Sequence, residues 1–173
     1  MRKVFLFIFG VMLISGTAFA EEVVVQMYLA GEQGPGKNIG IVTAGDSQYG
    51  IILTPLLSDL PPGIHGFHVH EKPDCSHVMK EGKSVAALAA GGHLDPSNTG
   101  KHEGPFGKGH LGDLPVLYVG VDGKAMLPVL APRLKVADLK GRSLMIHAGG
   151  DNYSDQPDKL GGGGARIACG VIK

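Results

Sequence analysis

Residues 91–113 read GGHLDPSNTGKHEGPFGKGHLGD, a stretch too rich in glycine, proline and asparagine for a helix or a strand. A loop of this composition cannot build a hydrophobic core of its own, so something else must hold its shape. The loop contains His93, His102, His110 and Asp113. Three imidazoles and one carboxylate complete a four-coordinate shell with no open position, which predicts a structural zinc ion. The alternative is a solvated loop whose histidines have no joint role.

A second group of histidines lies in residues 63–71, GIHGFHVHE. Residues 64–71 are expected to form a strand, and alternate side chains of a strand share a face. His68 and His70 therefore point the same way, with Cα atoms roughly 7 Å apart, and could hold one metal ion. His65 points to the other face, where we expect it to form a structural hydrogen bond to the backbone.

Two further histidines are ambiguous by themselves. His147 ends an apolar strand at the mouth of a loop, a position equally compatible with packing and with metal binding. Together with His68 and His70 it would supply a third imidazole. His77 follows Cys75 in a polar segment, and we expect it to be a surface residue.

The beginning of the chain has the pattern of an export signal. Two basic residues precede the apolar run 4–13, and Ala18-Phe19-Ala20 is a small-x-small cleavage site. This predicts a signal peptide over residues 1–20 and a mature domain over residues 21–173. The alternative is an amino-terminal membrane anchor, but the apolar run is short for a span of about 20 residues. No later segment is apolar enough to cross a bilayer.

Composition limits the remaining choices. A chain of 173 residues is long enough for one domain with a proper core. The whole chain has 16 basic and 16 acidic residues, and loss of the first twenty residues leaves 14 basic residues and a net charge of −2. No basic block indicates a nucleic-acid partner. Cys75 and Cys169 are the two cysteines of a chain bound for an oxidising compartment, so we expect one disulfide rather than two free buried thiols.

Short runs between turn signals predict an all-β protein. Residues 23–53 resemble an antiparallel meander, and Asp122-Gly123 predicts a hairpin turn between two later strands. We expect a short helical turn near residues 84–90 and no long helix. Two irregular segments, 72–114 and 149–164, are long enough to require a functional explanation. The expected strands are at 23–30, 38–44, 48–53, 64–71, 116–121, 125–130, 143–148 and 165–172.

These motifs together resemble one family, the copper,zinc superoxide dismutases, in its exported bacterial branch. The resemblance covers essentially all of the mature chain, and its motifs occur in the family order. They are HGFHVH at 65–70, GHLDP at 92–96, KHEGP at 101–105, GHLGD at 109–113, and the segment 162–172 with its arginine and cysteine. The resemblance implies a flattened eight-stranded Greek-key β-barrel, an immunoglobulin-like sandwich in which two long loops form the metal site.

The resemblance also implies two metal ions per subunit, one copper and one zinc. His93 would bridge the two ions through its two ring nitrogens. Zinc has no redox role and would order the loop, whereas an all-imidazole site suits copper. The implied copper ligands are His68, His70, His93 and His147, and the implied zinc ligands are His93, His102, His110 and Asp113.

Three further residue roles follow from the same resemblance. Asp151 would link a copper ligand to a zinc ligand as an outer carboxylate. Arg166 would meet an anionic substrate beside the copper, and Cys75 would be bonded to Cys169. The implied reaction is the dismutation of superoxide to dioxygen and hydrogen peroxide by copper cycling between Cu(II) and Cu(I), which would protect the periplasm from extracellular superoxide. The family includes monomers and homodimers, and the sequence does not choose between them.

Two rival functions belong to other classes. A copper-delivery protein on the same fold would be expected to lack a copper ligand or the arginine, and neither is missing. A zinc hydrolase needs an open coordination position, which Asp113 closes. His-x-His hydrolases also often continue with Asp and His, where this chain has Lys72 and Pro73. One departure from eukaryotic relatives is the absence of paired glutamates in residues 149–164, so the charges that steer the substrate stay open, with Lys80 and Lys159 as candidates.

Overall fold

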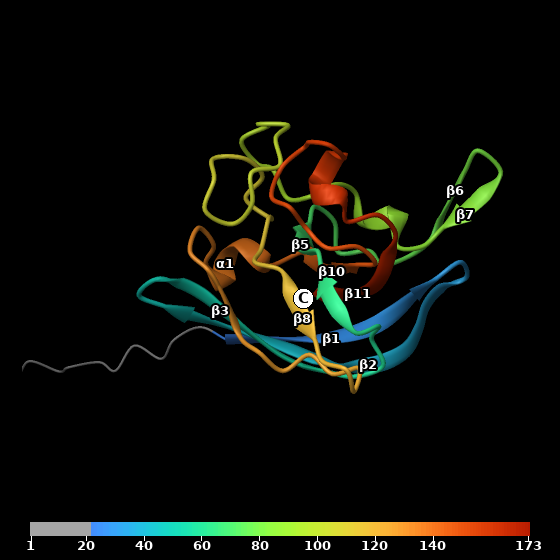
Figure 1. The fold of residues 1–173 in the computed structure, drawn as a ribbon, viewed down its shortest axis with the longest axis horizontal. Helices are drawn as coiled ribbons and strands as arrows, with labels where there is room; N and C mark the ends of the chain where they lie inside the picture. Colours follow the sequence, from blue (N-terminus) through green and yellow to red (C-terminus); the bar gives the residue numbers. More distant parts are fainter. Residues whose placement is uncertain (1–21) are drawn as a thin grey trace, which may run out of the picture.

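The computed structural model describes residues 22–173, which form a curled β-sheet with long loops gathered on one side (Figure 1). The predicted signal peptide, residues 1–20, lies outside the described residues. All strand pairs are antiparallel, and the main sheet has the order β5-β10-β11-β1-β2-β3-β9. The strands are β1 (Glu22–Gly31), β2 (Gly34–Ser47), β3 (Gly50–Leu57), β4 (Gly63–His65), β5 (Phe67–His70), β6 (Val78–Lys80), β7 (Lys83–Val85), β8 (Leu117–Val119), β9 (Val129–Ala131), β10 (Arg142–His147) and β11 (Arg166–Ile172).

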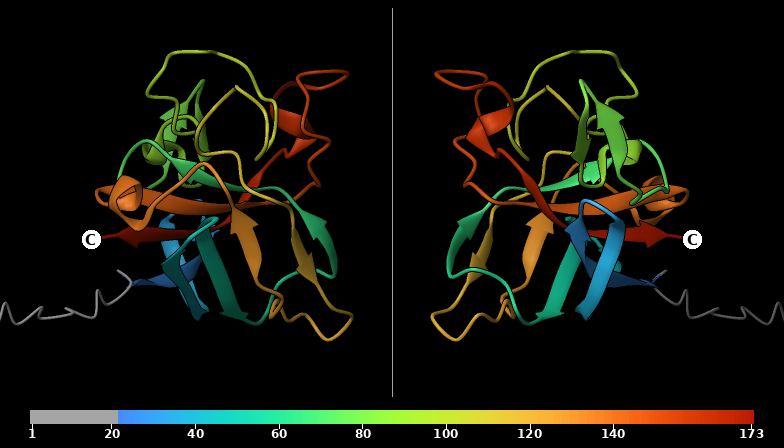
Figure 2. Two further views of the ribbon diagram at one scale, coloured as in Figure 1. Left: turned by 90° about the vertical axis from the view of Figure 1, so that its left-hand side faces the viewer. Right: turned by 90° about the vertical axis from the view of Figure 1, so that its right-hand side faces the viewer.

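The expected strand 64–71 is interrupted at Gly66. Its first part, β4, pairs with β8, and its second part, β5, pairs with β10. With β4 and β5 counted as one strand and the separate β6–β7 hairpin set aside, eight strands curl around the core (Figure 2). This arrangement confirms the expected all-β barrel, and the β1-β2-β3 order confirms the expected meander.

Alternation of side chains explains how the strands face the core. In β3, Ile51 and Leu53 are fully buried while Ile52 between them is exposed, as expected for a strand with one face in water. By contrast, all four residues of β5 are buried. Phe67 and Val69 belong to the barrel core, so the two histidines of β5 face outward and are buried by the covering loops. The loops therefore cover the outer face of β5.

The predicted hairpin after residue 120 is only half correct. The turn forms, because the Gly123 amide donates to the Gly120 carbonyl at 2.9 Å. The flanking strands do not pair with each other, since β8 pairs with β4 and β9 pairs with β3. The prediction of a paired hairpin is therefore wrong. Each of the two strands pairs on one side only, with a strand distant in sequence, so the local turn signal does not fix the strand partners.

The helical elements are short. They are η1 (Leu88–Ala90), within the predicted helical turn, α1 (Val136–Leu139) and η2 (Lys159–Gly162). No helix in the described part of the chain is long and apolar enough to span a membrane. The β6–β7 hairpin was not predicted, because residues 72–114 carry few strand signals.

The predicted disulfide is present. Cys75 and Cys169 are bonded, with Cα atoms 5.8 Å apart and a sequence separation of 94. Both cysteines are buried with Ala87, Ala90 and Met145 in a small second core. The disulfide therefore joins the first long loop, residues 72–114, to β11, the last strand of the barrel.

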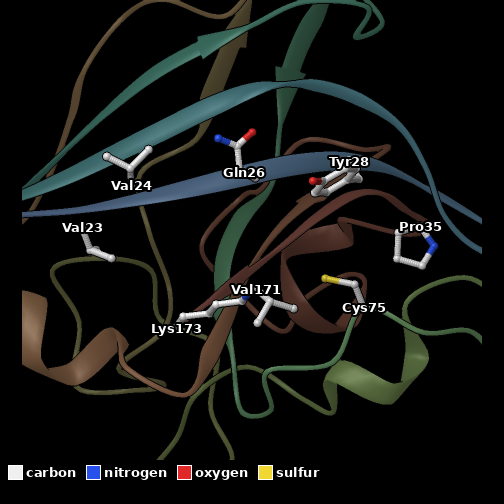
Figure 3. Close-up of a pocket in the computed structure, with 8 residues that line it drawn as sticks. All are labelled: Val23, Val24, Gln26, Tyr28, Pro35, Cys75, Val171 and Lys173. Atoms are coloured by element: carbon white, nitrogen blue, oxygen red, sulfur yellow. The ribbon is translucent and has the colours of Figure 1, made fainter.

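A groove of about 340 Å³ lies beside this disulfide (Figure 3). It opens where β1 and β11 diverge, since those strands pair only at Tyr28–Cys169 and Leu29–Ala168. Val23, Tyr28, Cys75 and Val171 are among its lining residues, which include no histidine, aspartate or glutamate. The groove therefore lacks the side chains that most often bind a metal ion.

Candidate metal centre

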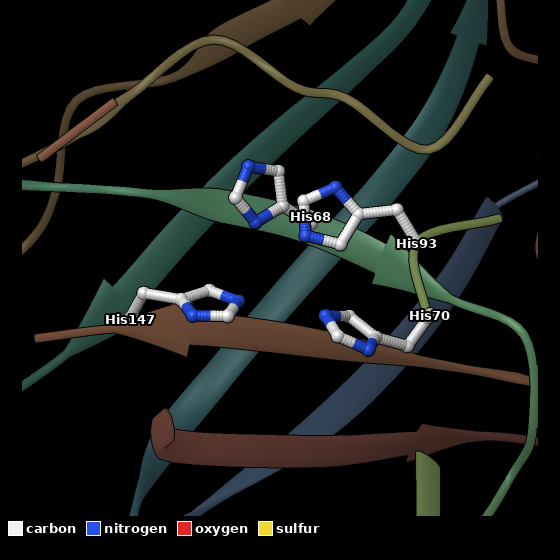
Figure 4. A group of neighbouring side chains, drawn as sticks. All are labelled: His68, His70, His93 and His147. Atoms are coloured by element: carbon white, nitrogen blue, oxygen red, sulfur yellow. The ribbon is translucent and has the colours of Figure 1, made fainter. Parts of the chain in front are cut away.

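Four histidines from three segments converge outside the barrel wall (Figure 4). Strand register sets β5 against β10, with His68 opposite Met145 and His70 opposite Ser143. An isolated bridge between His70 and His93 brings the first loop to the same place. One ring nitrogen from each histidine lies within 4.8 Å of the other three. The four are His68, His70, His93 and His147.

The inward nitrogens of this four-histidine group have no hydrogen-bond partner among the described residues. They are His68 Nδ1, His70 Nε2, His93 Nε2 and His147 Nε2, and all are buried. Buried polar atoms are normally paired, so four unpaired nitrogens facing one centre fit a bound cation. Nitrogen donors of this kind suit copper.

Hydrogen bonds on the outer nitrogens fix how these rings point. His70 Nδ1 donates to the Gly91 carbonyl at 3.0 Å, and His147 Nδ1 donates to the Gly164 carbonyl at 3.2 Å. Because a carbonyl only accepts, the proton lies on Nδ1 and the lone pair of Nε2 faces the centre. Such outer partners orient the ligands of metal sites.

A second cluster surrounds Asp113. Its carboxylate oxygens lie 2.9 Å from His93 Nδ1, 3.0 Å from His102 Nδ1 and 3.5 Å from His110 Nδ1. His93 therefore presents Nε2 to the four-histidine group and Nδ1 to the Asp113 cluster. The structure brings together all four residues that the sequence predicted around zinc.

His110 is the outermost member of the Asp113 cluster. The tight set of ligand atoms within 4.8 Å contains His68, His93, His102 and Asp113 but not His110. His68 falls in this set because its ring stacks on His93, with ring centroids 3.9 Å apart. The outer nitrogen of His68 is already bonded elsewhere, so it is a poorer candidate for this cluster than His110.

Asp151 joins the two groups. Its Oδ2 accepts from His68 Nε2 at 2.8 Å and its Oδ1 accepts from His102 Nε2 at 2.7 Å. The carboxylate is held by the backbone N–H of Tyr153 at 2.7 Å. Gly161 has φ of 70°, and a Cβ there would overlap Asp151 Oδ1, so glycine is required at this position.

The histidine pKa values are shifted in opposite directions in the four-histidine group and at His102 of the Asp113 cluster. Burial lowers the pKa of His68 and His70 well below the usual value and lowers the pKa of His147 to about 4. Neutral imidazole is the form that binds metals. Burial also acts against protonation of His102, but hydrogen bonds to Asp113 and Asp151 outweigh it and raise the pKa of His102 to about 9. The two carboxylates therefore make this cluster favourable to positive charge.

Arg166 stands beside the four-histidine group. It is opposite His147 in the register of β10 and β11. Its Nη1 donates to the Ala87 carbonyl and its Nη2 to the Gly91 carbonyl, both at 2.6 Å. The Gly91 carbonyl also accepts from His70, so one backbone oxygen positions both side chains.

The remaining two histidines, His65 and His77, lie outside both groups. His65 is buried on the core side, with its ring nitrogens 2.7 Å from the His147 carbonyl and 2.8 Å from the Pro61 carbonyl, so the expected structural hydrogen bond is confirmed. His77 belongs to neither group, but it is only partly exposed and its Nδ1 is buried, so the expected surface position is correct only in part. Arg133 and Asp155, which bind backbone atoms of the first loop, were missed. Their partners are main-chain atoms distant in sequence, which leave no motif.

Comparisons with known proteins agree with this geometry. A superoxide dismutase (Cu-Zn) 2 of Salmonella typhimurium is 61% identical over 150 residues, covering 86% of this chain and 87% of that protein. The structure of a Cu/Zn superoxide dismutase from Brucella abortus matches with a TM-score of 0.87 and 55% identity, over 88% of this chain and 100% of the other. The solution structure of a monomeric copper, zinc superoxide dismutase from Salmonella enterica matches with a TM-score of 0.80 and 59% identity, again over 88% and 100%.

A family model also covers most of the chain. The model described as copper/zinc superoxide dismutase (SODC) matches residues 38–172. This span contains both histidine groups, Arg166 and the disulfide. The chain therefore belongs to the copper/zinc superoxide dismutase family.

Proposed function

We propose that this copper/zinc superoxide dismutase holds its copper ion in the four-histidine group. The single observation that carries this proposal is the set of four buried ring nitrogens that face one centre without a partner among the described residues. The proposed copper ligands are His68 Nδ1, His70 Nε2, His93 Nε2 and His147 Nε2.

The Asp113 cluster would hold the zinc ion. Distances of 2.9, 3.0 and 3.5 Å from the Asp113 carboxylate to three Nδ1 atoms support this assignment. His93 would bridge the ions, because its two ring nitrogens face different groups. The proposed zinc ligands are His93, His102, His110 and Asp113.

The reaction converts two superoxide anions and two protons into one dioxygen and one hydrogen peroxide. When bound, copper supplies the alternate acceptance and donation of one electron. Arg166 carries a permanent positive charge in a planar fork, which suits the binding of a small anion beside the copper. Two of its donors are fixed on backbone carbonyls, so the guanidinium is already oriented. His93 Nε2 would hold and deliver one of the two protons in the part of the cycle in which it is not a copper ligand.

Metal analysis combined with a superoxide assay tests this function. We expect one copper and one zinc per chain, with activity lost on copper chelation and restored by copper. A copper-delivery protein would bind copper without accelerating superoxide loss. A zinc hydrolase would show no copper signal in an electron spin resonance spectrum.

Replacement of Arg166 by alanine should lower kcat/KM for superoxide by about 10- to 100-fold, because a charge-assisted hydrogen bond is worth about 1.5–3 kcal/mol. Copper and zinc contents should stay at the wild-type level, since Arg166 belongs to neither ligand set. Pulse radiolysis on the fully metal-loaded variant gives the rate. Full turnover by this variant would remove Arg166 from substrate binding.

Replacement of Asp151 by alanine should weaken zinc binding by about 10- to 100-fold, the usual cost of losing an outer partner of a metal ligand. The variant leaves the outer nitrogens of His68 and His102 without their carboxylate. Competition with a chromogenic chelator measures the change. The matched control is Asp158→Ala, which removes an exposed carboxylate from the same loop and should leave zinc affinity unchanged. Equal zinc affinity in both variants would contradict the role given to Asp151.

We also propose that residues 1–20 are a signal peptide and that residues 21–173 are a periplasmic domain. The disulfide supports an oxidising compartment. Amino-terminal sequencing of protein from a periplasmic fraction should begin after Ala20. A homodimer is compatible with this proposal but unnecessary for the site, because one chain supplies both ligand sets. Sedimentation of the purified protein determines the oligomeric state.

A further inference from the structure

Arg133 lies between β9 and α1, outside the proposed ligand sets, and clamps the first long loop. Its guanidinium donates to four backbone carbonyls of residues 104–110. Nε donates to Pro105 at 3.0 Å, Nη1 to Gly109 at 3.1 Å and Nη2 to Gly104 at 3.1 Å. Nη2 also donates to the His110 carbonyl in a short contact.

Tight folding of the loop brings these carbonyls together. A Cβ at Gly109 would overlap the Lys101 carbonyl oxygen, and a Cβ at Gly107 would overlap the Glu103 carbonyl oxygen. The His110 amide donates to the same Lys101 oxygen at 2.9 Å. Arg133 has no carboxylate partner in the described part of the chain, where the ion pairs involve other residues. Its charge is therefore compensated by the carbonyl dipoles that it gathers.

His110 differs from the other proposed ligands in how its ring is oriented. The rings of His68, His70, His102 and His147 each have a hydrogen bond on the nitrogen away from their metal. His110 has no hydrogen bond of this kind among the described residues, and its Nδ1 lies 3.5 Å from Asp113. Metal-bound histidines almost always have such an outer partner. The position of the His110 ring therefore depends on its backbone.

We propose that Arg133 is the positioning residue for His110 and that it acts through the His110 carbonyl. By fixing that carbonyl, the guanidinium sets where the imidazole meets the zinc ion. This inference rests on the proposed zinc ligands. Lysine could keep the charge at this site but could not bond four carbonyls with a planar fork.

Zinc affinity of the full-length mature protein, measured by chelator competition, tests the inference. Arg133→Ala should bind zinc about 10- to 100-fold more weakly, in line with loss of an outer partner, and should keep its copper. The zinc affinity of Arg133→Lys should lie between those of Arg133→Ala and wild type. The lysine variant also tests the inference if the alanine variant does not fold. Arg142→Ala is the matched control, because Arg142 donates to the Glu71 carbonyl and not to residues 104–110.

A double-mutant cycle separates positioning from general stability. In the His110→Ala background, Arg133→Ala should change zinc affinity by less than about twofold, because the ring that it positions is absent. An undiminished effect in that background would overturn the inference, as would wild-type affinity of both Arg133 variants. If His110→Ala alone keeps wild-type zinc affinity, the proposed zinc set fails instead. Cobalt(II) placed in the zinc site should give an altered visible spectrum in Arg133→Ala.

Discussion

Replacing His70 with alanine should lower superoxide dismutation by more than about 100-fold, because loss of a ligand costs at least as much as loss of an outer partner. His70 is fully buried in β5 and belongs to the four-histidine group alone. Its Nε2 is one of the unpaired nitrogens, and its Nδ1 is bonded to the Gly91 carbonyl. The variant should therefore lose copper and keep zinc. Metal analysis and a superoxide assay on the same sample measure both effects.

His77→Ala is the control for this experiment. His77 is partly exposed and lies outside both histidine groups, so its replacement should leave copper content and activity unchanged. Wild-type activity in His70→Ala, with copper still bound, would contradict the proposed copper site. Loss of zinc together with copper would instead indicate that the two groups fold as one unit.

Removal of the disulfide should lower the free energy of unfolding by about 4–5 kcal/mol, because the bond closes a long loop in the unfolded chain. The sequence separation is 94, and both sulfurs are buried in the second core. Urea unfolding of the metal-free Cys75→Ala, Cys169→Ala double variant against oxidised wild type gives the difference. The comparison must use metal-free protein, since bound ions add their own stabilisation.

Reduced wild type is the control for the disulfide prediction. It should unfold close to the double variant, because both lack the covalent closure. A loss below about 1 kcal/mol in both samples would mean that the chain-entropy account fails for this protein. Ala87 packs against the disulfide, and its carbonyl accepts a hydrogen bond from Arg166 Nη1. Loss of the disulfide should therefore also leave the guanidinium of Arg166 less firmly oriented.

The amino-acid sequence alone indicated the strands and the candidate ligands. Short β-branched runs between turn signals and the His-x-His spacing of β5 are local patterns, so they could be read without a fold. The disulfide was predicted from two cysteines in a chain whose beginning has the pattern of an export signal. The resemblance to the family supplied the prediction that His93 bridges two metal ions, and the structure shows its two ring nitrogens facing two groups.

The tertiary structure decided which strands pair and which residues support the proposed ligands. The turn at Asp122-Gly123 was readable, yet β8 pairs with β4 and β9 pairs with β3, and the turn does not specify these partners because they are distant in sequence. The placement of Arg166 opposite His147 depends on the register of β10 and β11. Arg133 had no sequence signal at all, since its partners are carbonyls that every residue possesses.

Residue type and short spacing thus determined which atoms are available for metal chemistry in this protein. The fold determined which of those atoms meet, and what holds them. The physical reason is the separation in sequence of the residues that meet. The type of each ligand can be read from its own side chain, whereas Asp151 is hydrogen-bonded to His68 and His102, which lie 83 and 49 positions away. Only the folded barrel with its covering loops brings segments so distant in sequence within hydrogen-bond distance.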